Sequence, residues 1–192
     1  MQAVTLRSLR RLPDTMHQQQ YFETRFMPVR SKMYRFALRL LGEEQEAEDV
    51  VQDVLLKIWK QRHRFEEISN AEAWCMQLTR NLSLDRLKSP RRKLRATLEG
   101  WDGAEERATP DREAEVKDAM QRMRSLLKGL PEMQQAVLHL REVEGYSYQE
   151  MTEVLELDLN QVKVYLHRAR KALREQLMAQ DRYGLATDRN AG

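Results

Sequence analysis

The chain has 192 residues, enough for one domain or for two small helical ones. Charged residues make up 33% of it, while seven glycines and five prolines leave little material for tight turns. This composition favours an all-α fold and argues against an extensive sheet. The formal net charge of +3 and the isoelectric point near 9.0 are mild, so any binding of polyanions has to come from local clusters of basic residues.

The single cysteine, Cys75, excludes an intramolecular disulfide and a zinc site built from several thiolates of this chain. It lies in an apolar helical pattern beside Trp74, so we interpret it as a core residue, with a reactive thiol as the alternative. No apolar run reaches the roughly 20 residues of a membrane-spanning helix. The N-terminal arginines are not followed by the apolar segment that a signal peptide would have. We therefore expect a cytoplasmic protein without membrane insertion.

The first predicted element is one long helix that ends at Gly42. Its apolar residues recur at intervals of three and four, as on the buried face of a helix. They are Phe22, Phe26, Val29, Met33, Phe36, Ala37 and Leu40. A second helix is predicted over residues 43–62, with acids at its start and bases at its end, as the helix dipole favours. Its inner face consists of Ala47, Val50, Val51, Val54, Leu55, Ile58 and Trp59.

A loop around HRFEEI precedes a third predicted helix. Ser69 and Glu72 have the spacing of a capping box, in which each side chain binds the other residue's backbone N–H. The helix carries the apolar residues Trp74, Leu78, Leu82 and Leu87. The three helices together can bury one shared core.

A change of composition between residues 86 and 115 marks the boundary between two domains. Residues 86–95 contain six bases and no acid, and Pro90 ends the helix. The acidic, glycine-containing stretch that follows is typical of a linker. We divide the chain into an extension (1–17), a first domain (18–95), a linker (96–115), a second domain (116–179) and a tail (180–192).

The second domain begins with a helical pattern from Val116 to Leu127 and a further helix between Pro131 and Gly145. Two capping boxes follow, SYQE at residues 147–150 and DLNQ at residues 158–161. Each is flanked by an apolar staple pair, Tyr146 with Met151 and Leu157 with Val162. Two short capped helices joined by a tight turn are the outline of a helix-turn-helix, whose second helix enters the DNA major groove.

The second of these helices contains LHRARKALR at residues 166–174, a run that could simply be a solvated helix face. However, its side chains separate into two stripes. The apolar stripe is Val162, Leu166, Ala169, Leu173 and Leu177, and the basic stripe is Lys163, His167, Arg170, Lys171 and Arg174. Because this separation coincides with the helix-turn-helix outline, we predict that the basic stripe binds DNA phosphates, with base edges in reach of the helix start.

Two parts of the chain resemble the sigma factors of bacterial RNA polymerase in their short, extracytoplasmic-function (ECF) form. EEQEAEDVVQDVLLKIWKQRHRF with AWCMQLTRNLSLDRLKS resembles sigma domain two. LPEMQQAVLHLREVEGYSYQEMTEVLELDLNQVKVYLHRARKAL resembles sigma domain four. The resemblance implies an all-α chain of two small domains joined by a flexible acidic linker. It also implies a polymerase subunit with no catalytic chemistry and no cofactor, whose partners are core RNA polymerase, promoter DNA and an anti-sigma factor.

By this resemblance, domain two binds the clamp helices of the largest polymerase subunit through the outward side of the second predicted helix. The residues on that side are Glu46, Asp49, Gln52, Asp53 and Leu56. Asp49 and Asp53 form a like-charge pair four residues apart, which slightly destabilises an isolated helix. A cationic partner would explain the pair, and an ordinary acidic first turn is the alternative.

Domain two of this family also captures bases of the minus-ten promoter element that are flipped out of the stack. The resemblance places this pocket on residues 64–70 and the start of TRNLSLDR, with Asn81 as the best single candidate. A plain surface role is the alternative for Asn81. The complete set, including bases for backbone phosphates, is Arg64, Phe65, Asn70, Arg80, Asn81, Arg86 and Lys88.

Domain four of the family reads the minus-thirty-five element. Lys163, Val164, His167 and Arg168 match the family's positions that face the DNA groove. Arg170 and Lys171 match its phosphate contacts. The chain departs from the family pattern at the turn, where Glu156 replaces the usual glycine, and at Val164 and Tyr165. We expect a local adjustment of the turn and an altered promoter preference.

Two rival functions remain open at this point. An enzyme would need a carboxylate metal site built from Glu43, Glu46, Asp49 and Asp53, but no histidine has a glutamate three residues before it, as the di-iron bundles have. A DNA-binding regulator with a sensory N-terminal domain would share the helix-turn-helix. Binding to core polymerase distinguishes the two functions, because a sigma factor needs the core enzyme to recognise a promoter and an ordinary regulator does not. A sigma factor must also place two separate helical bodies at two sites on one DNA duplex.

Overall fold

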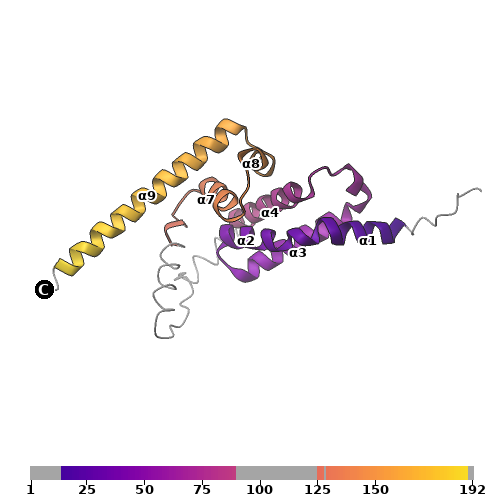
Figure 1. Ribbon diagram of the computed structural model, residues 1–192. Helices are drawn as coiled ribbons and strands as arrows, with labels where there is room; N and C mark the ends of the chain where they lie inside the picture. The colour runs from indigo at the N-terminus through magenta and orange to yellow at the C-terminus, as the bar shows by residue number, and fades with distance from the viewer. Residues whose placement is uncertain (1–13, 90–124, 128, 190–192) are drawn as a thin grey trace, which may run out of the picture.

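The computed structural model describes residues 14–89, 125–127 and 129–189. Within these ranges the chain is helical and contains no strand, and two groups of helices are visible in Figure 1. The predicted all-α, two-domain architecture is confirmed. The predicted linker, most of the N-terminal extension and the residues from 116 to 124 lie outside the described ranges.

The first predicted helix is two helices with a break between them. α1 (Asp14–Arg25) is followed by the 3₁₀ turn η1 (Met27–Val29) and by α2 (Arg30–Leu41). The prediction of a single helix was wrong because Pro28 lies at the break, where it has no N–H to donate and disfavours helical geometry in the residue before it. The predicted apolar face is right, since Phe26, Met33 and Phe36 are fully buried.

α2 ends at Gly42, as predicted, and the next two helices complete domain two. Gly42 has a φ of 75°, the left-handed conformation of a helix C-cap that glycine adopts without strain. α3 (Glu44–Lys60) leads through the 3₁₀ helix η2 (Arg62–Glu67) to α4 (Ala71–Lys88). The predicted inner face of α3 is confirmed at its five buried residues, Ala47, Val50, Val51, Val54 and Ile58.

The start of α4 differs from the predicted capping box. Asn70, and not Ser69, is the N-cap, and its Oδ1 accepts a hydrogen bond from the Ala73 amide at 3.0 Å. Glu72 therefore does not close a box with Ser69. Its carboxylate instead accepts hydrogen bonds from Lys32 and Tyr146.

One side of α4 is buried and includes two polar residues, Thr79 and Ser83. Thr79 and Ser83 are completely buried, and their hydroxyls donate to the carbonyl oxygens of Cys75 and Thr79, at 2.8 Å each. These bonds satisfy the hydroxyls inside the helix. Cys75 is a buried core residue, as predicted, and burial raises the pKa of its thiol to about 12. A reactive thiolate is thereby excluded.

Domain four consists of four described elements. α7 (Glu132–Leu138), with Pro131 at its N-cap, passes into a π-helical turn, η3 (His139–Val143). α8 (Tyr148–Leu155) and α9 (Leu159–Arg189) are the predicted helix-turn-helix pair. α9 is 31 residues long and projects away from the rest of the molecule in Figure 1.

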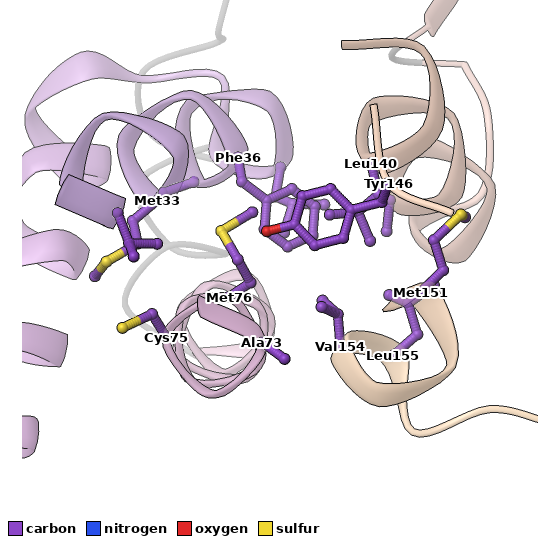
Figure 2. Close-up of a cluster of buried hydrophobic side chains, with 14 of the residues drawn as sticks. Met33, Phe36, Ala73, Cys75, Met76, Leu140, Tyr146, Met151, Val154 and Leu155 are labelled. Atoms are coloured by element: carbon purple, nitrogen blue, oxygen red, sulfur yellow. The ribbon is translucent and has the colours of Figure 1, made fainter. Parts of the chain in front are cut away.

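The two domains pack directly against each other and share one hydrophobic cluster. In Figure 2, Ala73 and Met76 of α4, with Phe36 of α2, face Tyr146, Val154 and other side chains of domain four. Met76 and Val154 are completely buried. The two domains are thus recognisable by their helices but share one cluster of buried apolar side chains.

Candidate nucleic-acid and partner interfaces

Both predicted capping boxes of the helix-turn-helix are present. The Ser147 hydroxyl accepts from the Glu150 amide at 3.2 Å, and the Glu150 carboxylate accepts from the Ser147 amide at 2.7 Å. These hydrogen bonds lower the pKa of Glu150. Asp158 and Gln161 exchange the same pair of bonds at 2.8 and 2.9 Å. The caps define where α8 and α9 begin and hence the direction in which α9 leaves the turn.

The turn between α8 and α9 contains an unusual backbone conformation at Glu156. Its φ of 55° makes it the one residue other than glycine with positive φ among the described residues. Its N–H donates to the Thr152 carbonyl oxygen and so closes α8. The local adjustment expected in the turn is therefore the left-handed conformation of Glu156 itself. For a residue other than glycine this conformation costs about 1–2 kcal/mol.

α9 presents the predicted basic face to solvent. Val162, Leu166 and Ala169 are buried and anchor the helix against domain four. The exposed residues on its other sides include Lys163, Val164, His167, Arg168, Arg170, Lys171 and Arg174. Arg170 also binds Glu142 of η3 through two hydrogen bonds of 3.1 and 2.6 Å.

The predicted apolar stripe of α9 ends earlier than expected. Leu173 is half-buried, and Leu177 is 37% exposed, so its assignment to the core was wrong. By this point α9 projects outward from the other described helices of domain four, as Figure 1 shows.

The acidic face of α3 is accessible, and its most exposed large apolar residue is Leu56, at 57%. Gln52 is exposed, while Glu46 and Asp49 are half-buried. The like-charge pair has a partner within the chain, because Arg86 of α4 contacts Asp53 at 2.6 Å and Asp49 at 3.6 Å. The pair therefore does not require an external cation to explain it.

The residues predicted for the minus-ten element do not form one open surface. Arg64 is exposed beside Glu67, and Lys88 and Asn81 are exposed on α4. Phe65 is 2% exposed and packs on Phe26 with ring centroids 4.8 Å apart, so its ring belongs to the core and cannot stack on a base.

Of the remaining members of this set, Arg86 lies at Asp53 of α3, while Asn70 and Arg80 lie beside domain four. Asn70 Nδ2 donates to the Glu153 carboxylate at 2.6 Å. Burial lowers the pKa of the Arg80 guanidinium, and the nearby carboxylates of Glu156 and Glu132 oppose that effect.

A polar network between the domains was not predicted. Arg35 of α2 donates to both carboxylate oxygens of Glu144 at 2.9 and 2.6 Å, and His139 contacts the same carboxylate at 3.1 Å. Burial alone would raise the pKa of Glu144, yet the hydrogen bond from Arg35 and the neighbouring His139 lower it overall. Burial lowers the pKa of His139 to about 4.

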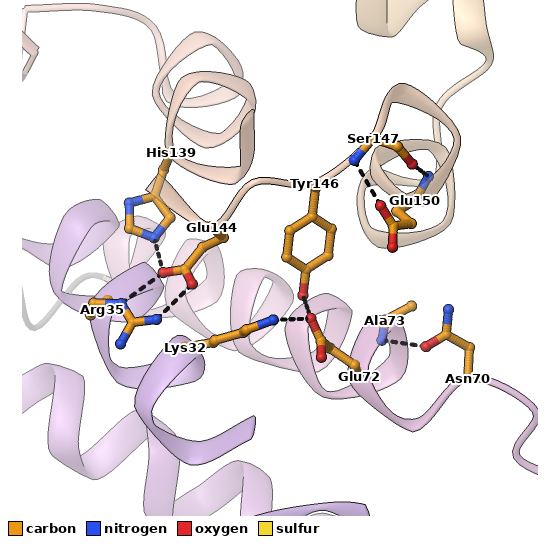
Figure 3. Close-up of polar contacts among 10 residues, drawn as sticks. All are labelled: Lys32, Arg35, Asn70, Glu72, Ala73, His139, Glu144, Tyr146, Ser147 and Glu150. Carbon is orange, nitrogen blue, oxygen red and sulfur yellow. Dashed lines mark hydrogen bonds and ion pairs between the residues drawn. The ribbon is translucent and has the colours of Figure 1, made fainter. Parts of the chain in front are cut away.

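A second contact joins Tyr146 to Glu72, whose carboxylate also accepts from Lys32, with both distances 2.5 Å (Figure 3). Burial and this hydrogen bond raise the pKa of Tyr146. The bonded partners in the two contacts are up to 109 residues apart in sequence. No local pattern could therefore have indicated them.

Across the parts of the chain that the structure describes, no three His, Cys, Asp or Glu side chains are grouped to hold a metal ion. Within the same ranges, no helix has the length and apolar character to cross a membrane.

Comparison with known families matches Sigma-70 region 2 to residues 26–93 and Sigma-70, region 4 to residues 120–173. The ECF RNA polymerase sigma factor SigL of Mycobacterium tuberculosis strain H37Rv is 32% identical over 145 residues, which are 74% of this chain and 80% of SigL. The chain belongs to the ECF sigma factors of the sigma-70 family. It is an alternative sigma factor that directs promoter-specific transcription by RNA polymerase, and not an enzyme.

Other relatives of this sigma factor agree. SigX of Bacillus subtilis is 25% identical over 162 residues, 81% of this chain and 83% of SigX. The structure of RpoE from Bartonella quintana, solved with the anti-sigma factor NepR, matches 82% of this chain and 96% of RpoE with a TM-score of 0.64 and 25% identity. CnrH, solved with the cytosolic domain of CnrY, shares the fold with a TM-score of 0.54, covering 86% of this chain and 90% of CnrH at 22% identity. The stand-alone regulator is not favoured, because both sigma regions are present.

Proposed function

We propose that the exposed basic face of α9 reads the minus-thirty-five element. The observation that carries this proposal is the position of that face on the second helix of a doubly capped helix-turn-helix, with its opposite side anchored by Val162, Leu166 and Ala169. Residues near the start of such a helix reach base edges, and those further along meet phosphates. The proposed set is Lys163, Val164, His167, Arg168, Arg170 and Lys171.

The test compares the double variant Lys163→Ala, Arg168→Ala with a control variant, Arg174→Ala. Lys163→Ala with Arg168→Ala should weaken binding of the polymerase holoenzyme to a promoter by roughly 1–3 kcal/mol for each side chain that no longer reaches a base. Arg174→Ala removes another exposed arginine further along α9 and should have a smaller effect. Transcription is measured from a promoter that needs the upstream element. If the double variant and Arg174→Ala reduce it equally, this face is removed from the proposal.

The outward side of α3 is proposed as the surface that binds core polymerase, through Glu46, Asp49, Gln52, Asp53 and Leu56. An exposed leucine among half-exposed carboxylates suits a partner with apolar and basic groups. Because Asp49 and Asp53 also hold Arg86, reversing their charges would disturb α4 as well. Leu56→Arg is the cleaner test, and Glu44→Lys, at the exposed start of the same helix, is its control. Binding of purified core polymerase should be lost only with Leu56→Arg.

For the minus-ten element we propose Arg64, Asn70, Arg80, Asn81 and Lys88. Phe65 is left out because its ring is buried, and Arg86 is assigned to the acidic face of α3, which it organises. Replacing Asn81 with Ala should reduce promoter opening, measured by permanganate reactivity of unpaired thymines, without changing recruitment of the core enzyme. Equal opening by both proteins would return Asn81 to an ordinary surface role.

An anti-sigma factor is a further proposed partner, because the similar RpoE of Bartonella quintana was solved in complex with the anti-sigma factor NepR. We propose that this chain acts in the cytoplasm, where polymerase and promoter DNA are found. Co-purification of the chain from its own host, with and without core polymerase, tests both proposals.

A further inference from the structure

The outward face of α9 places an apolar side chain among polar ones. Val164 lies two residues from Val162 and two from Leu166, and both of these are buried in domain four. Because each residue turns an α-helix by about 100°, Val164 points roughly opposite that buried side. It is 45% exposed and is not among the described residues that form or contact the shared hydrophobic cluster. Packing within the described chain therefore does not explain this side chain.

The close neighbours of Val164 on that face can all form hydrogen bonds. In a helix, the side chains three and four residues away lie beside a given residue. For Val164 these are Asn160 and Gln161 before it and His167 and Arg168 after it, and all four are exposed. Amide, imidazole and guanidinium groups can bind base edges or phosphates, whereas the two methyl groups of valine can do neither. Val164 is thus a small apolar area inside a polar, hydrogen-bonding surface.

The position of the Val164 side chain is well defined. A β-branched side chain has one strongly preferred rotamer in a helix. Val162 and Leu166 anchor the backbone beneath it in the core. Further along the helix, Arg170 donates two hydrogen bonds to Glu142 of η3. A side chain restricted in this way loses little conformational entropy when it contacts a partner, so its methyl groups are preorganised for binding.

A base pair that faces Val164 in the major groove has to offer an apolar group. Thymine is the one base with a methyl group there, on C5, while guanine, adenine and cytosine present hydrogen-bond donors and acceptors. Against Val164, such a polar edge would lose its water without gaining a hydrogen-bond partner, which is unfavourable. A thymine methyl group and the valine methyl groups would instead remove each other's apolar surface from water.

We infer that Val164 recognises the C5-methyl group of a thymine in the minus-thirty-five element and so selects a T·A pair at the position it faces. The inference rests on the proposed function of α9 in reading that element. Arg170 and Lys171, proposed for phosphates, contribute affinity that does not depend on the base sequence. Val164 contributes little affinity but determines which base pair is preferred at one position.

The first experiment identifies the thymine. Polymerase holoenzyme containing this sigma factor selects duplexes from a promoter of its own host in which the minus-thirty-five element is randomised. The unchanged protein should enrich one thymine, on either strand, that Val164→Ser does not enrich. Val143→Ser is the matched control, because Val143 of η3 is a 59% exposed valine outside the proposed DNA-binding set, and it should enrich the same thymine as the unchanged protein. If Val164→Ser and the unchanged protein enrich the same bases, the inference is overturned.

The second experiment removes only the methyl group. Deoxyuridine in place of the selected thymidine lacks the C5-methyl group but keeps the hydrogen-bonding groups of the base pair. Burial of one methyl group corresponds to about fourfold in affinity, so the unchanged holoenzyme should bind the uracil promoter about fourfold more weakly. Val143→Ser should keep this difference, and Val164→Ser should bind both promoters equally well. The comparison of the two DNAs with the unchanged protein requires no variant to fold.

The outcomes separate this inference from the proposed function of α9. If Lys163→Ala with Arg168→Ala weakens promoter binding but uracil at every thymine of the element leaves the affinity of the unchanged holoenzyme as it was, the methyl contact fails and α9 remains the reading helix. A uracil effect that persists in full with Val164→Ser also overturns the inference, because another side chain then contacts the methyl group. If the double variant binds every promoter as well as the unchanged protein, the minus-thirty-five function fails and the inference fails with it.

Discussion

Acidification should destabilise this sigma factor through one residue, His139. The imidazole is buried between the domains, stacks on Phe36 of α2 with ring centroids 5.4 Å apart, and faces Glu144, Arg35 and Arg39. Burial lowers its pKa from 6.5 to about 4. Between these two values the unfolded chain binds a proton that the folded chain does not, so the free energy of unfolding falls as the pH falls.

The size of the effect follows from the two pKa values. Between pH 7.5 and pH 5.5, a shift from 6.5 to about 4 removes about 1.3 kcal/mol from the free energy of unfolding. For a chain of this size that corresponds to a decrease of roughly 3–5 °C in Tm. Glu144, whose pKa is also lowered, would add to the loss only at more acidic pH, below the ordinary carboxylate range.

The assay is urea denaturation followed by circular dichroism at both pH values, for the unchanged chain and for His139→Gln. Glutamine keeps a neutral donor beside Glu144 but does not titrate. The difference between the two proteins isolates His139 from every other titrating group, and it should shrink by about 1.3 kcal/mol on acidification. If both proteins lose the same stability between pH 7.5 and 5.5, the imidazole is not buried in its neutral form and the reasoning is refuted.

Four further changes test the fold itself by thermal or urea denaturation. Glu156→Gly should raise stability by about 1 kcal/mol, because glycine adopts φ 55° without strain, and Gly145→Ala, at φ 75° with open space around it, should lower stability by a similar amount. Ser147→Ala removes the N-cap of α8 and should lower the free energy of unfolding by about 1 kcal/mol. An unchanged denaturation midpoint would contradict this expectation. Met76→Ala should cost about 2–5 kcal/mol, since its side chain is fully buried, and a loss under 1 kcal/mol would indicate that the interface is looser than described.

The helix-turn-helix could be predicted in detail because its determinants are local. Ser147 with Glu150 and Asp158 with Gln161 satisfy backbone donors within one turn, so their spacing in the sequence indicates where each helix begins. The same reasoning predicted the start of α4 one residue too early. Asn70 is the N-cap in place of Ser69, and Glu72 accepts a hydrogen bond from Tyr146. Local rules predict caps well only when no distant partner attracts the side chain.

The parts of the site that escaped prediction depend on contacts between distant residues. Phe65 looked like an accessible aromatic, yet the break at Pro28 allows Phe26 to pack against it. Arg86 looked like a phosphate ligand, yet α3 and α4 bring it to Asp53. Which basic residue is neutralised inside the fold, and which remains available for a partner, depends on packing that a single sequence does not encode locally.

The length of α9 has a consequence for how evenly its backbone is protected. With 31 residues at 1.5 Å each, it extends about 46 Å, but past Ala169 none of its described side chains up to Ala179 is buried. Ala172, Leu173 and Gln176 are only half-buried, so tertiary packing protects these turns less than the turns before Ala169. Amide hydrogens should therefore exchange with solvent deuterium slowly around Leu166 and progressively faster toward Arg189, giving a gradient of protection along one continuous helix.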